Sequence, residues 1–486
     1  MDNLFTEENI SKLFGQEAAE DEEFDRLQSY YIKNKTHEKL TANLPLRILV
    51  GHKGIGKSAI FTIARHEDID AHRISILIRP DDIANIGKGG VDFSQMIRDW
   101  KKGLTAIITE KIFDNLGLFS KNEDYRELVS TGGKIINFLK NTFSGKIKEI
   151  NLDSTDKAII NQFLKENRII IYIDDLDRGW ESKREDIQRI SALLNAVRDM
   201  CNDNKGLQFR ISLRTDVYYL VRTSDESTDK IESSVIWHSW TNHEILLLLI
   251  KRIETFFNRQ IDIEKLKDVR QSNLAHYLDD IFERRFIAYG KWENVPMYRI
   301  LMSLIRKRPR DLVKLCTLAA KDAFNNNSDK IKTKNLQAIF SEYSQGRIQD
   351  TVNEYKSELP QIERLLLNMK PSRKEIKEHK GYIYDTNRIK AKIRNIIEQG
   401  KFTFTNGKVA TDAELLQFMY KINFVTARKE LSDGRIERKY FEENKYLSYQ
   451  FVNFGYDWEI HPAFRWALSP DNVESVFADI DLSFED

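Results

Sequence analysis

The sequence predicts an α/β fold in which a parallel β-sheet is followed by a helical lid and a C-terminal winged-helix-like domain. Short apolar runs alternate with helical patterns through the first half of the chain. Alternation of this kind produces a parallel sheet with helices on both faces. A glycine-rich loop joins the first apolar run to a helix. Beyond Trp237 the strand signal fades, and helical patterns dominate until strand patterns return near the C-terminal end.

Composition sets limits on the class of protein. A chain of 486 residues exceeds one ordinary hydrophobic core and predicts two to four packed units. Lysine and arginine number 76 against 75 acidic residues, so the charge gives no global basic field for nucleic acid or membrane. Cys201 and Cys316 have no companions at metal-ligand spacing, which predicts neither a disulfide framework nor a zinc site. A reducing, cytoplasmic location fits this pattern.

The first residues and the hydropathy predict no membrane contact. The start of the chain is acidic and amphipathic, unlike the basic-then-apolar order of a signal peptide. No apolar run approaches the roughly 20 residues that a membrane span needs. We therefore divide the chain into four segments. They are an N-terminal helical leader at 1–43, a core at 44–237, a helical lid at 238–330 and a helical, winged-helix-like domain at 331–486.

Each segment is defined by its pattern of apolar residues. An apolar stripe predicts a helix from Ser11 to Lys39 in the leader. In the core we expect a buried strand from Leu46 to Val50 and a helix from Lys57. Three further strands are predicted, at Arg73–Ile78, Arg168–Asp175 and Leu207–Arg214.

The apolar pattern of the second half predicts mainly helices. The lid begins with NHEILLLLIKRIETFF at 242–257 and continues through RPRDLVKLCTLAAKDAF to about Phe324. Near the end, ELLQFMYKINFVTARKEL at 414–431 predicts a helix and KYLSYQFVN at 445–453 a strand. The segment DWEIHPAFRWAL at 457–468 closes the unit. Helix, strand, strand and terminal helix together favour a winged helix.

The segment GHKGIGKS matches G-x-x-x-x-G-K-S in full and lies between an apolar strand and a helix start. Its glycines allow backbone N–H groups to surround phosphates, and the helix N-terminus favours their negative charge. Lys57 reaches the β- and γ-phosphates, while the Ser58 hydroxyl ligates Mg²⁺. The predicted nucleotide-binding residues of this loop are Gly51, His52, Lys53, Gly54, Ile55, Gly56, Lys57, Ser58 and Ala59.

Acidic residues follow the buried strand Ile169–Ile173, at the edge where the carboxyl ends of parallel strands meet. We predict that Asp174 holds the metal through water, and that Asp175 orients and deprotonates the attacking water. Many ATPases carry the longer glutamate at the second position, so slow turnover, or a share of the role for Asp177, stays open. The alternative for Asp175 and Asp177 is a solvated strand end or a helix cap.

Two arginines are predicted to contact the nucleotide. Arg214 ends the strand ISLRTDV and is assigned as the γ-phosphate reporter; the alternative is a salt bridge to Asp174 or Asp177. Arg310 begins a lid helix with Pro309 suited to its first turn, and can reach back to the nucleotide. For Arg310 and its neighbour Arg308 the alternative is a cationic turn on the surface.

These elements together resemble the bacterial STAND/KAP-related branch of AAA+-like P-loop ATPases. The resemblance rests on GHKGIGKS at 51–58, IYIDDLDR at 171–178, ISLRTDV at 211–217 and RPRDLVKL at 308–315. The leader FGQEAAEDEEF at 14–24 and the tail IHPAFRWAL at 460–468 also resemble a FunZ-type P-loop ATPase group. The matches span most of the chain.

The resemblance implies an ATPase core, a lid with a sensor arginine and nucleotide-dependent self-association. It also implies a sensor or regulator role in bacterial defence against phage and plasmids, beside a separate effector protein. No effector or repeat array is recognisable in this sequence, so what it senses is left open. If the protein forms homo-oligomers, an exposed arginine such as Arg222 could enter a neighbour's site, although spacing does not select it.

The predicted function is therefore a molecular switch that binds Mg-ATP and hydrolyses it to ADP and phosphate. One alternative is a DNA-associated ATPase that grips phosphates through the winged helix and a basic segment. The cations of that segment are Arg373, Lys374, Lys377, Arg388, Lys390, Lys392 and Arg394. Another alternative is a small-molecule kinase, which the long C-terminal half disfavours. His238 and His461 lack metal-ligand neighbours and are interpreted as packing residues.

Overall fold

The computed structural model describes most of the chain as two compact units. The described residues are 4–17, 21–88, 92–116, 118, 123–146, 154–224, 226–378, 381–432, 436–443, 456–469 and 476–477. The first unit, here the lid unit, comprises Met1–Ile32, Lys53–Gly56 and Ser239–Asp486. The second, here the sheet unit, comprises Lys33–His52 and Lys57–His238. The four-segment division drawn from the sequence stays a prediction.

The sheet unit is built on a five-stranded parallel sheet with the order β2-β3-β4-β1-β5. Four strands lie where the sequence predicts them, and the short β5 was not predicted. Strand β5 has three residues, too few for an alternation of apolar and polar residues to be recognised in the sequence. The strands are β1 (Leu46–Val50), β2 (Ile74–Ile78), β3 (Ile169–Ile173), β4 (Leu207–Leu213) and β5 (Val235–Trp237).

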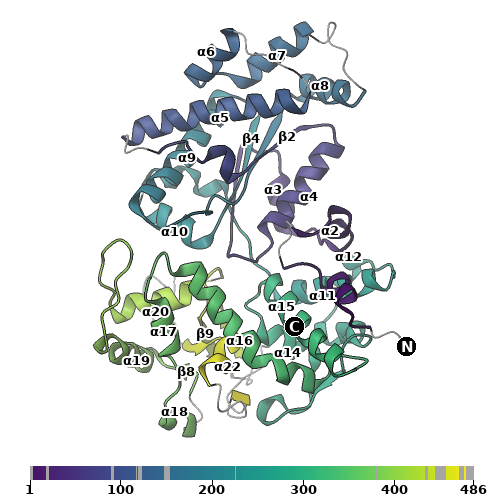
Figure 1. Ribbon diagram of the computed structural model, residues 1–486, viewed down its shortest axis with the longest axis vertical. Helices are drawn as coiled ribbons and strands as arrows, with labels where there is room; N and C mark the ends of the chain where they lie inside the picture. The colour runs from purple at the N-terminus through teal and green to yellow at the C-terminus, as the bar shows by residue number, and fades with distance from the viewer. Residues whose placement is uncertain are drawn as a thin grey trace. The chain divides into compact units, whose positions relative to one another are not determined.

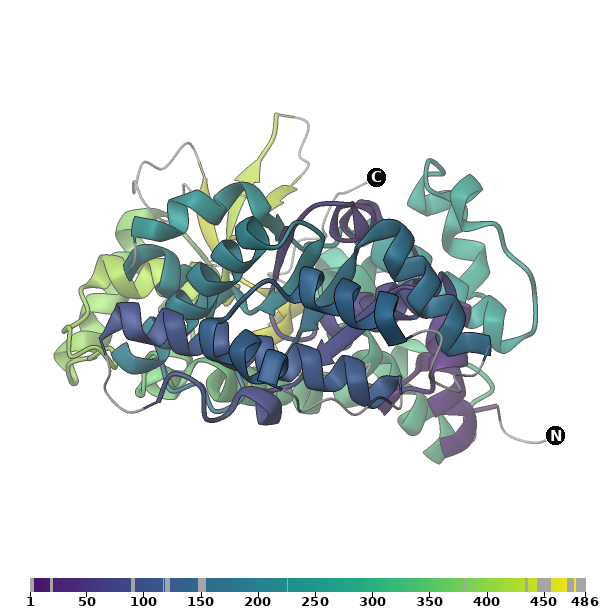
Figure 2. The same cartoon turned by 90° about the horizontal axis from the view of Figure 1, so that it is seen from above.

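Helices cover this sheet and supply its core (Figures 1 and 2). Strand β3 reads IIIYI and is buried at every residue, as expected of a strand covered on both faces. Trp100 of the long helix α5 is fully buried and belongs to the same core. The helices are α3 (Lys35–Thr41), α4 (Lys57–Asp70), α5 (Phe93–Asn115), α6 (Glu123–Thr131), α7 (Ile135–Lys146), α8 (Ser154–Glu166), α9 (Arg184–Asp203) and α10 (Thr215–Ser224), with 3₁₀ turns η2 (Pro80–Ile83) and η3 (Glu226–Ser234).

The leader is not one helix, so the prediction of a helix from Ser11 to Lys39 is wrong. It forms α1 (Glu7–Phe14), α2 (Phe24–Tyr30) and α3. Helix α1 ends at Gly15, whose φ of 76° lies in the left-handed region that glycine tolerates. Before α3, Asn34 is extended and its side chain accepts a hydrogen bond from the His37 N–H. The apolar stripe is real, but local caps divide it.

The lid region is helical, as predicted, and adds a short hairpin that was not. Helix α15 begins at Pro309, because proline fits the first helical position. Helix α11 begins with a capping box between Thr241 and Glu244. The elements are α11 (Asn242–Phe256), α12 (Ile263–Leu266), α13 (Gln271–Leu274), η4 (Ala275–Leu278), β6 (Arg285–Phe286), η5 (Gly290–Trp292), β7 (Val295–Pro296), α14 (Met297–Leu304), α15 (Pro309–Asn325) and α16 (Thr333–Tyr355).

The C-terminal part of the lid unit has the strand-helix-helix-strand-strand order of a winged helix, with β10 as an added edge strand. Its four strands form an antiparallel sheet of order β10-β9-β11-β8. The elements are α17 (Ile362–Leu367), α18 (Arg373–Lys377), β8 (Ile383–Tyr384), α19 (Thr386–Glu398), α20 (Asp412–Lys421), β9 (Val425–Glu430), β10 (Ile436–Lys439), β11 (Asp457–Ile460), η6 (Pro462–Phe464) and α22 (Arg465–Leu468).

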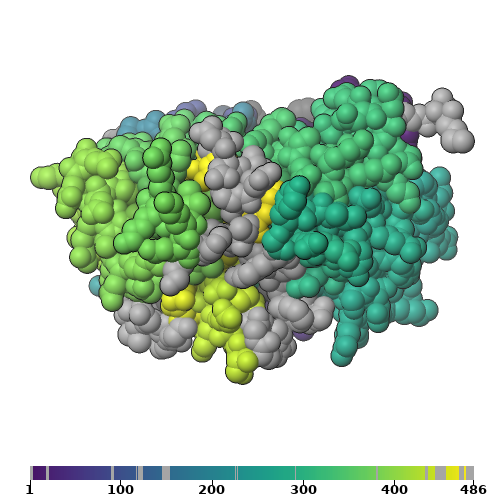
Figure 3. All heavy atoms as spheres, turned by 90° about the horizontal axis from the view of Figure 1, so that it is seen from below, coloured from purple at the N-terminus to yellow at the C-terminus, as the bar shows by residue number. Residues whose placement is uncertain are grey.

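Two local predictions for this part meet different outcomes. The helix expected over 414–431 stops at Lys421, and β9 takes over from Val425. Asn423, with a φ of 58°, makes the turn between them. The strand expected at 445–453 lies outside the described residues. In Figure 3 the yellow-green surface belongs to this C-terminal part.

A buried ion cluster joins the strands of the C-terminal sheet to α22. The Glu459 carboxylate is fully buried and pairs with Arg438 at 2.7 Å and with Arg465. Burial alone would raise its pKa. The two arginines outweigh that effect and hold the pKa of Glu459 at about 2.

This cluster predicts an acid-dependent loss of stability. In the unfolded chain a glutamate has a pKa of about 4.3, above the folded value, so the stabilisation is present at neutral pH and lost as pH falls from about 4.3 toward 2. We expect Glu459→Gln to lower stability at pH 7 by about 3 kcal/mol or more, because two buried arginines lose their partner.

Thermal unfolding followed by circular dichroism between pH 5 and pH 2.5 tests this. The wild type should lose more of its melting temperature than Glu459→Gln over that window. Glu430→Gln, whose side chain is 63% exposed, serves as the control and should follow the wild type. Equal slopes for wild type and Glu459→Gln would contradict the assignment.

Candidate functional site

The glycine-rich loop lies between β1 and α4, as predicted. Gly51 donates its N–H to the Leu213 carbonyl at 3.2 Å, which fastens the start of the loop to the neighbouring strand β4. Gly54 and Gly56 have φ values of 78° and 100°, a conformation that side chains other than glycine seldom adopt. Helix α4 then begins at Lys57. The loop therefore ends on a helix N-terminus, where backbone N–H groups favour an anion.

Lys57 points back into the loop. Its Nζ donates to the carbonyl oxygens of Gly51 at 2.9 Å and His52 at 3.1 Å. His52 is buried, and Ser58 and Ala59 are partly buried in the first turn of α4. The lysine is thus held close to the backbone that would surround a phosphate.

The acidic pair follows β3 directly. The Asp174 carboxylate is half-buried and accepts a hydrogen bond from the Asp175 N–H at 2.9 Å. Asp175 is exposed and has a φ of 59°, an unusual value for a residue other than glycine, asparagine or aspartate. The left-handed turn places the exposed Asp175 directly after the half-buried Asp174.

Strand order decides what lies between the loop and the acidic pair. Strand β4 pairs with β1 on one side and β3 on the other, so its carboxyl end separates them. Because all three strands are parallel, Gly51, Asp174 and Arg214 leave the same edge of the sheet. One strand, β4, therefore separates the loop strand from the acidic strand.

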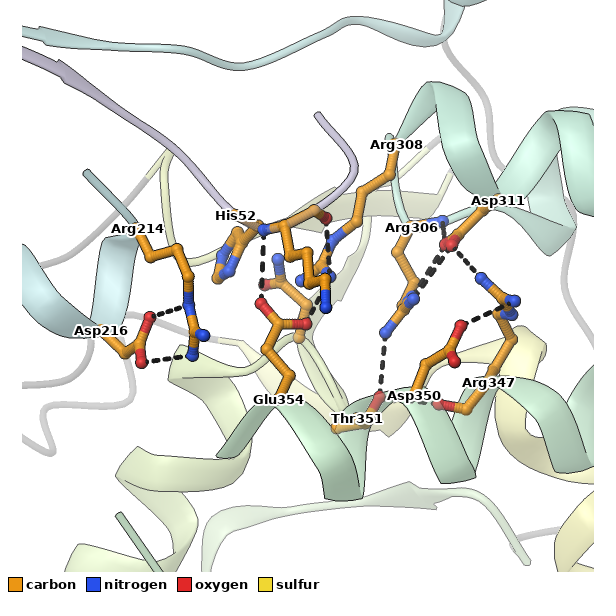
Figure 4. Close-up of polar contacts among 12 residues, drawn as sticks. His52, Arg214, Asp216, Arg306, Arg308, Asp311, Arg347, Asp350, Thr351 and Glu354 are labelled. Carbon is orange, nitrogen blue, oxygen red and sulfur yellow. Dashed lines mark hydrogen bonds and ion pairs between the residues drawn. The ribbon is translucent and has the colours of Figure 1, made fainter. Parts of the chain in front are cut away.

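Arg214 forms ion pairs with two carboxylates at that edge. It bonds both oxygens of Asp216, at 3.0 Å and 2.6 Å (Figure 4). Its Nη1 also lies 3.2 Å from Asp177. The salt bridge to Asp177 was an alternative drawn from the sequence, whereas Asp216 was not considered as a partner. Next in the chain, the Thr215 hydroxyl is fully buried and finds no hydrogen-bond partner among the described residues.

The tip of the phosphate loop, Lys53–Gly56, belongs to the lid unit and is held there by several contacts. Lys53 N–H donates to Glu354 Oε1 at 3.3 Å. Arg310 N–H donates to the Gly54 carbonyl at 3.3 Å, and its Nε to the Glu17 carbonyl at 2.9 Å. The Trp240 indole donates to the Ile55 carbonyl at 2.7 Å. Backbone and side chains of the lid unit therefore fix the shape of the tip.

The segment that carries Arg308 is not a surface turn. Arg308 is only 2% exposed, Arg306 is equally enclosed, and Arg310 is half-buried. Arg308 Nη1 lies 3.3 Å from Glu354 and 3.4 Å from the Lys53 carbonyl. Lys307 between the arginines adopts a left-handed φ of 53°. A cationic surface turn, considered for this segment, does not describe Arg308.

Behind this turn lies a buried network centred on Asp311 (Figure 4). Its carboxylate bonds Arg306 at 2.8 and 2.9 Å and Arg347 at 2.7 Å. Arg306 also donates to the Thr351 hydroxyl at 3.0 Å. Burial would raise the pKa of Asp311, but these arginines hold it well below its usual range. Of this network, the sequence motif RPRD at 308–311 contains only Asp311.

The histidines match their interpretation as packing residues. His461 is buried, shares a 2.9 Å hydrogen bond with the Tyr440 hydroxyl and accepts one from the Ala463 N–H. Burial and the nearby Arg306 and Arg438 lower the pKa of His461 to about 3, so it is neutral at physiological pH. No group of three or more histidine, cysteine or acidic side chains that could hold a metal occurs among the described residues.

A comparison with protein-family models found one match, which lies in the helical lid region and the helix that follows it. The model of the FunZ-associated C-terminal helical domain matches residues 244–352, which run from the start of α11 almost to the end of α16. The chain resembles FunZ-type P-loop proteins. The resemblance to the FunZ-type group is confirmed, although the matching model falls on the lid rather than on the leader or the tail.

The chain also has a curated relative along almost its full length. It is 23% identical over 526 aligned positions to the putative transposon gamma-delta 80.3 kDa protein of Escherichia coli K12, covering 97% of this chain and 70% of the relative. The kinship to STAND and KAP proteins stays a prediction.

Two solved structures resemble the chain more weakly. The ORC2 protein of Aeropyrum pernix, with ADPNP and ADP, is 11% identical with a TM-score of 0.40 and covers 90% of this chain and 92% of its own. Cdc6p of Pyrobaculum aerophilum is 13% identical with a TM-score of 0.27, covering 93% and 92%. The fold assignment rests on the sheet and the loop described above. In the described part of the chain, no helix is long and apolar enough to cross a bilayer.

The close approach of Arg310 to the loop predicts that Gly54 tolerates no side chain. A Cβ at Gly54 would lie 2.9 Å from the Arg310 Cβ, and the φ of 78° adds strain. Gly54→Ala should therefore destabilise the lid unit by about 1–3 kcal/mol, measured by thermal or urea unfolding. Gly407→Ala is the control, because it has a similar φ of 85° and open space. Equal losses for both variants would refute crowding at Gly54.

Proposed function

We propose that this protein binds Mg-ATP and hydrolyses it to ADP and phosphate, and uses the cycle as a conformational switch. One arrangement carries the proposal: the glycine-rich loop, the Asp174–Asp175 pair and Arg214 leave the same edge of a parallel sheet. That edge is where ligands bind in open α/β sheets. A phosphate chain with a metal and an attacking water needs donors, carboxylates and a cation in such an arrangement.

The loop residues bind and orient the nucleotide in this proposal. Backbone N–H groups of residues 51–59 and the start of α4 receive the phosphates. Lys57 exchanges its bonds to the Gly51 and His52 carbonyls for the β- and γ-phosphate oxygens. Arg310 is the lid residue we assign to the nucleotide, because its backbone already contacts Gly54.

The metal would be shared between the protein and the nucleotide. Ser58 offers a hydroxyl, and Asp174 a carboxylate that would hold the metal through water. Oxygen is the ligand atom that Mg²⁺ prefers, and Mg²⁺ usually keeps several waters beside substrate phosphates. When bound, Mg²⁺ would neutralise charge that develops on the phosphates. The residues fit this cofactor.

Asp175 is the proposed base for the attacking water. Its left-handed backbone and exposure set it apart from Asp174, whose carboxylate is engaged by the Asp175 N–H. Aspartate reaches less far than glutamate, which predicts slow turnover. Arg214 is proposed to read the γ-phosphate, and its bonds to Asp216 and Asp177 would keep it oriented until then.

The biological setting is proposed from kinship. Resemblance to STAND and KAP ATPases favours a cytoplasmic sensor or regulator in defence against phage or plasmids, working as a homo-oligomer with a separate effector. The relative named as a transposon gamma-delta protein instead favours a place in the biology of mobile elements. Both settings use a nucleotide-dependent switch, so the biochemical proposal is common to them.

Steady-state phosphate release from ATP tests the activity. We expect Lys57→Ala to abolish nucleotide binding, since the β- and γ-phosphates lose their cation, and Asp175→Asn to keep binding but lose about 10²-fold or more in turnover. Removal of Mg²⁺ with a chelator should stop phosphate release in the wild type. Light scattering with and without nucleotide would report self-association.

Lys53→Ala is the matched control, because Lys53 is exposed and not required by the motif. It should retain most of the activity. Phosphate release that survives in both Lys57→Ala and Asp175→Asn would contradict the assigned residues, and its transfer to a metabolite instead of water would indicate a kinase.

A second candidate, DNA association, is favoured by the winged-helix order of the C-terminal elements. Helix α20 would be the groove-reading helix in such a module, yet its residues are buried or half-buried. Exposed cations lie instead on α18, at Arg373, Lys374 and Lys377, and Arg394 of α19 is also exposed. Within α19, Lys392 pairs with Glu375 and Arg394 with Asp412, which reduces the charge offered to phosphates. Any DNA contact of this module should therefore use α18.

Salt-dependent binding to duplex DNA tests this candidate. Replacing Arg373, Lys374 and Lys377 together by glutamine should weaken binding and lower the slope of log affinity against log salt by up to about 3. Lys265→Gln, another exposed lysine of the same unit, is the control. Absence of binding, or a slope unaffected by the triple variant, would remove α18 as a DNA contact.

A further inference from the structure

A carboxylate of α16 is bound to the tip of the phosphate loop (Figure 4). Glu354 Oε1 accepts the Lys53 N–H at 3.3 Å, and Oε2 lies 3.3 Å from Arg308 Nη1. The same Nη1 donates to the Lys53 carbonyl at 3.4 Å. All three residues belong to the lid unit. Glu354, Arg308 and the Lys53 backbone therefore form a closed triangle of polar contacts.

The triangle is shielded from solvent, which strengthens its electrostatics. The side chains of Glu354 and Arg308 are 4% and 2% exposed. Among the described residues, Arg308 Nε and Nη2 have no hydrogen-bond partner although they are buried. A guanidinium carries five N–H donors, and buried donors are normally satisfied. Arg308 thus retains donors for an additional acceptor beside the loop tip.

We infer that Glu354 is a specificity-determining residue of the nucleotide site, whose carboxylate competes with the terminal phosphate of ATP for the loop tip and Arg308. The inference rests on the proposed function, since it needs a nucleotide in the loop. A carboxylate and a γ-phosphate repel each other at short range in a poorly screened site. ATP must therefore displace Glu354 or bind against its charge, whereas ADP carries no γ-phosphate to the tip.

Displacement of Glu354 would be transmitted along α16. Arg347 and Thr351 lie about two turns and one turn before Glu354 on the same helix, and both belong to the Asp311 network. That network holds the turn that carries Arg308. A change at the loop tip is thereby linked, through residues of one unit, to the helix that packs on α15 and α22.

Calorimetric titration of the full chain with ATP and with ADP tests the inference. Glu354→Gln keeps the size and an acceptor oxygen for the Lys53 N–H but removes the charge. We expect it to tighten ATP binding about tenfold and ADP binding by less than about threefold. Asp350→Asn removes a carboxylate one turn earlier, 54% exposed and paired with Arg347, and should leave both affinities within about twofold of wild type.

The outcomes separate this inference from the proposed function. If wild type binds ATP, Lys57→Ala does not, and a folded Glu354→Gln binds ATP no more tightly than wild type, the competition is wrong while the nucleotide site stands. If Glu354→Gln tightens ATP and ADP equally, the discrimination is wrong. If wild type binds neither nucleotide, both proposals are overturned.

A measurement on the wild type covers the case in which Glu354→Gln fails to fold. Hydrogen exchange of peptides that span 347–358 should accelerate several-fold with a non-hydrolysable ATP analogue, compared with saturating ADP, because the last turn of α16 loses its anchor. Peptides from α11 in the same unit provide the internal control and should not change. Equal protection of 347–358 with the two nucleotides would overturn the inference.

Discussion

The buried carboxylate of Asp311 is the constraint on which the lid unit depends. It pairs with Arg306 and Arg347, two guanidinium groups that are almost completely enclosed. Charges are buried at such cost only when they are paired and hydrogen-bonded, and loss of one partner leaves the others uncompensated. With Arg306 held from the start of α15, the chain reverses through Lys307 in a left-handed conformation. That reversal places Arg308 and Arg310 at the tip of the phosphate loop.

The division of the phosphate loop follows from this arrangement. Lys53–Gly56 group with the lid unit, while the loop's flanking strand and helix group with the sheet unit. The tip receives hydrogen bonds from Arg310 and Trp240 and gives one to Glu354. Conventional phosphate loops close around the nucleotide with their own backbone. Here the tip has a second set of partners, so the state of the loop and the state of the lid are linked by direct contacts.

The sequence predicted the parts of the site that a continuous stretch of chain encodes. The loop from Gly51 to Ser58, the strand before Asp174 and the proline start of α15 each carry their signal within a few residues, and each lies where it was expected. The acidic partners Glu354 and Asp216 were not predicted from the sequence, because tertiary packing determines which of many carboxylates lies beside a given arginine. The prediction of a single leader helix was wrong for a local reason. Caps at Gly15 and Asn34 end and restart the helix in spite of a regular apolar stripe.

Helix α16 shows why its functional residues give so weak a sequence signal. Ser344, Arg347, Thr351 and Glu354 recur every three or four residues and are all buried, so one helix face is polar and enclosed. An apolar period indicates a core, whereas a buried polar period resembles a solvated face in sequence. Such a face costs stability unless each group has its partner. Arg347 bonds Asp311, Thr351 bonds Arg306, and Glu354 bonds Arg308 and the Lys53 N–H. The buried polar groups of this face are therefore paired beside the tip of the phosphate loop.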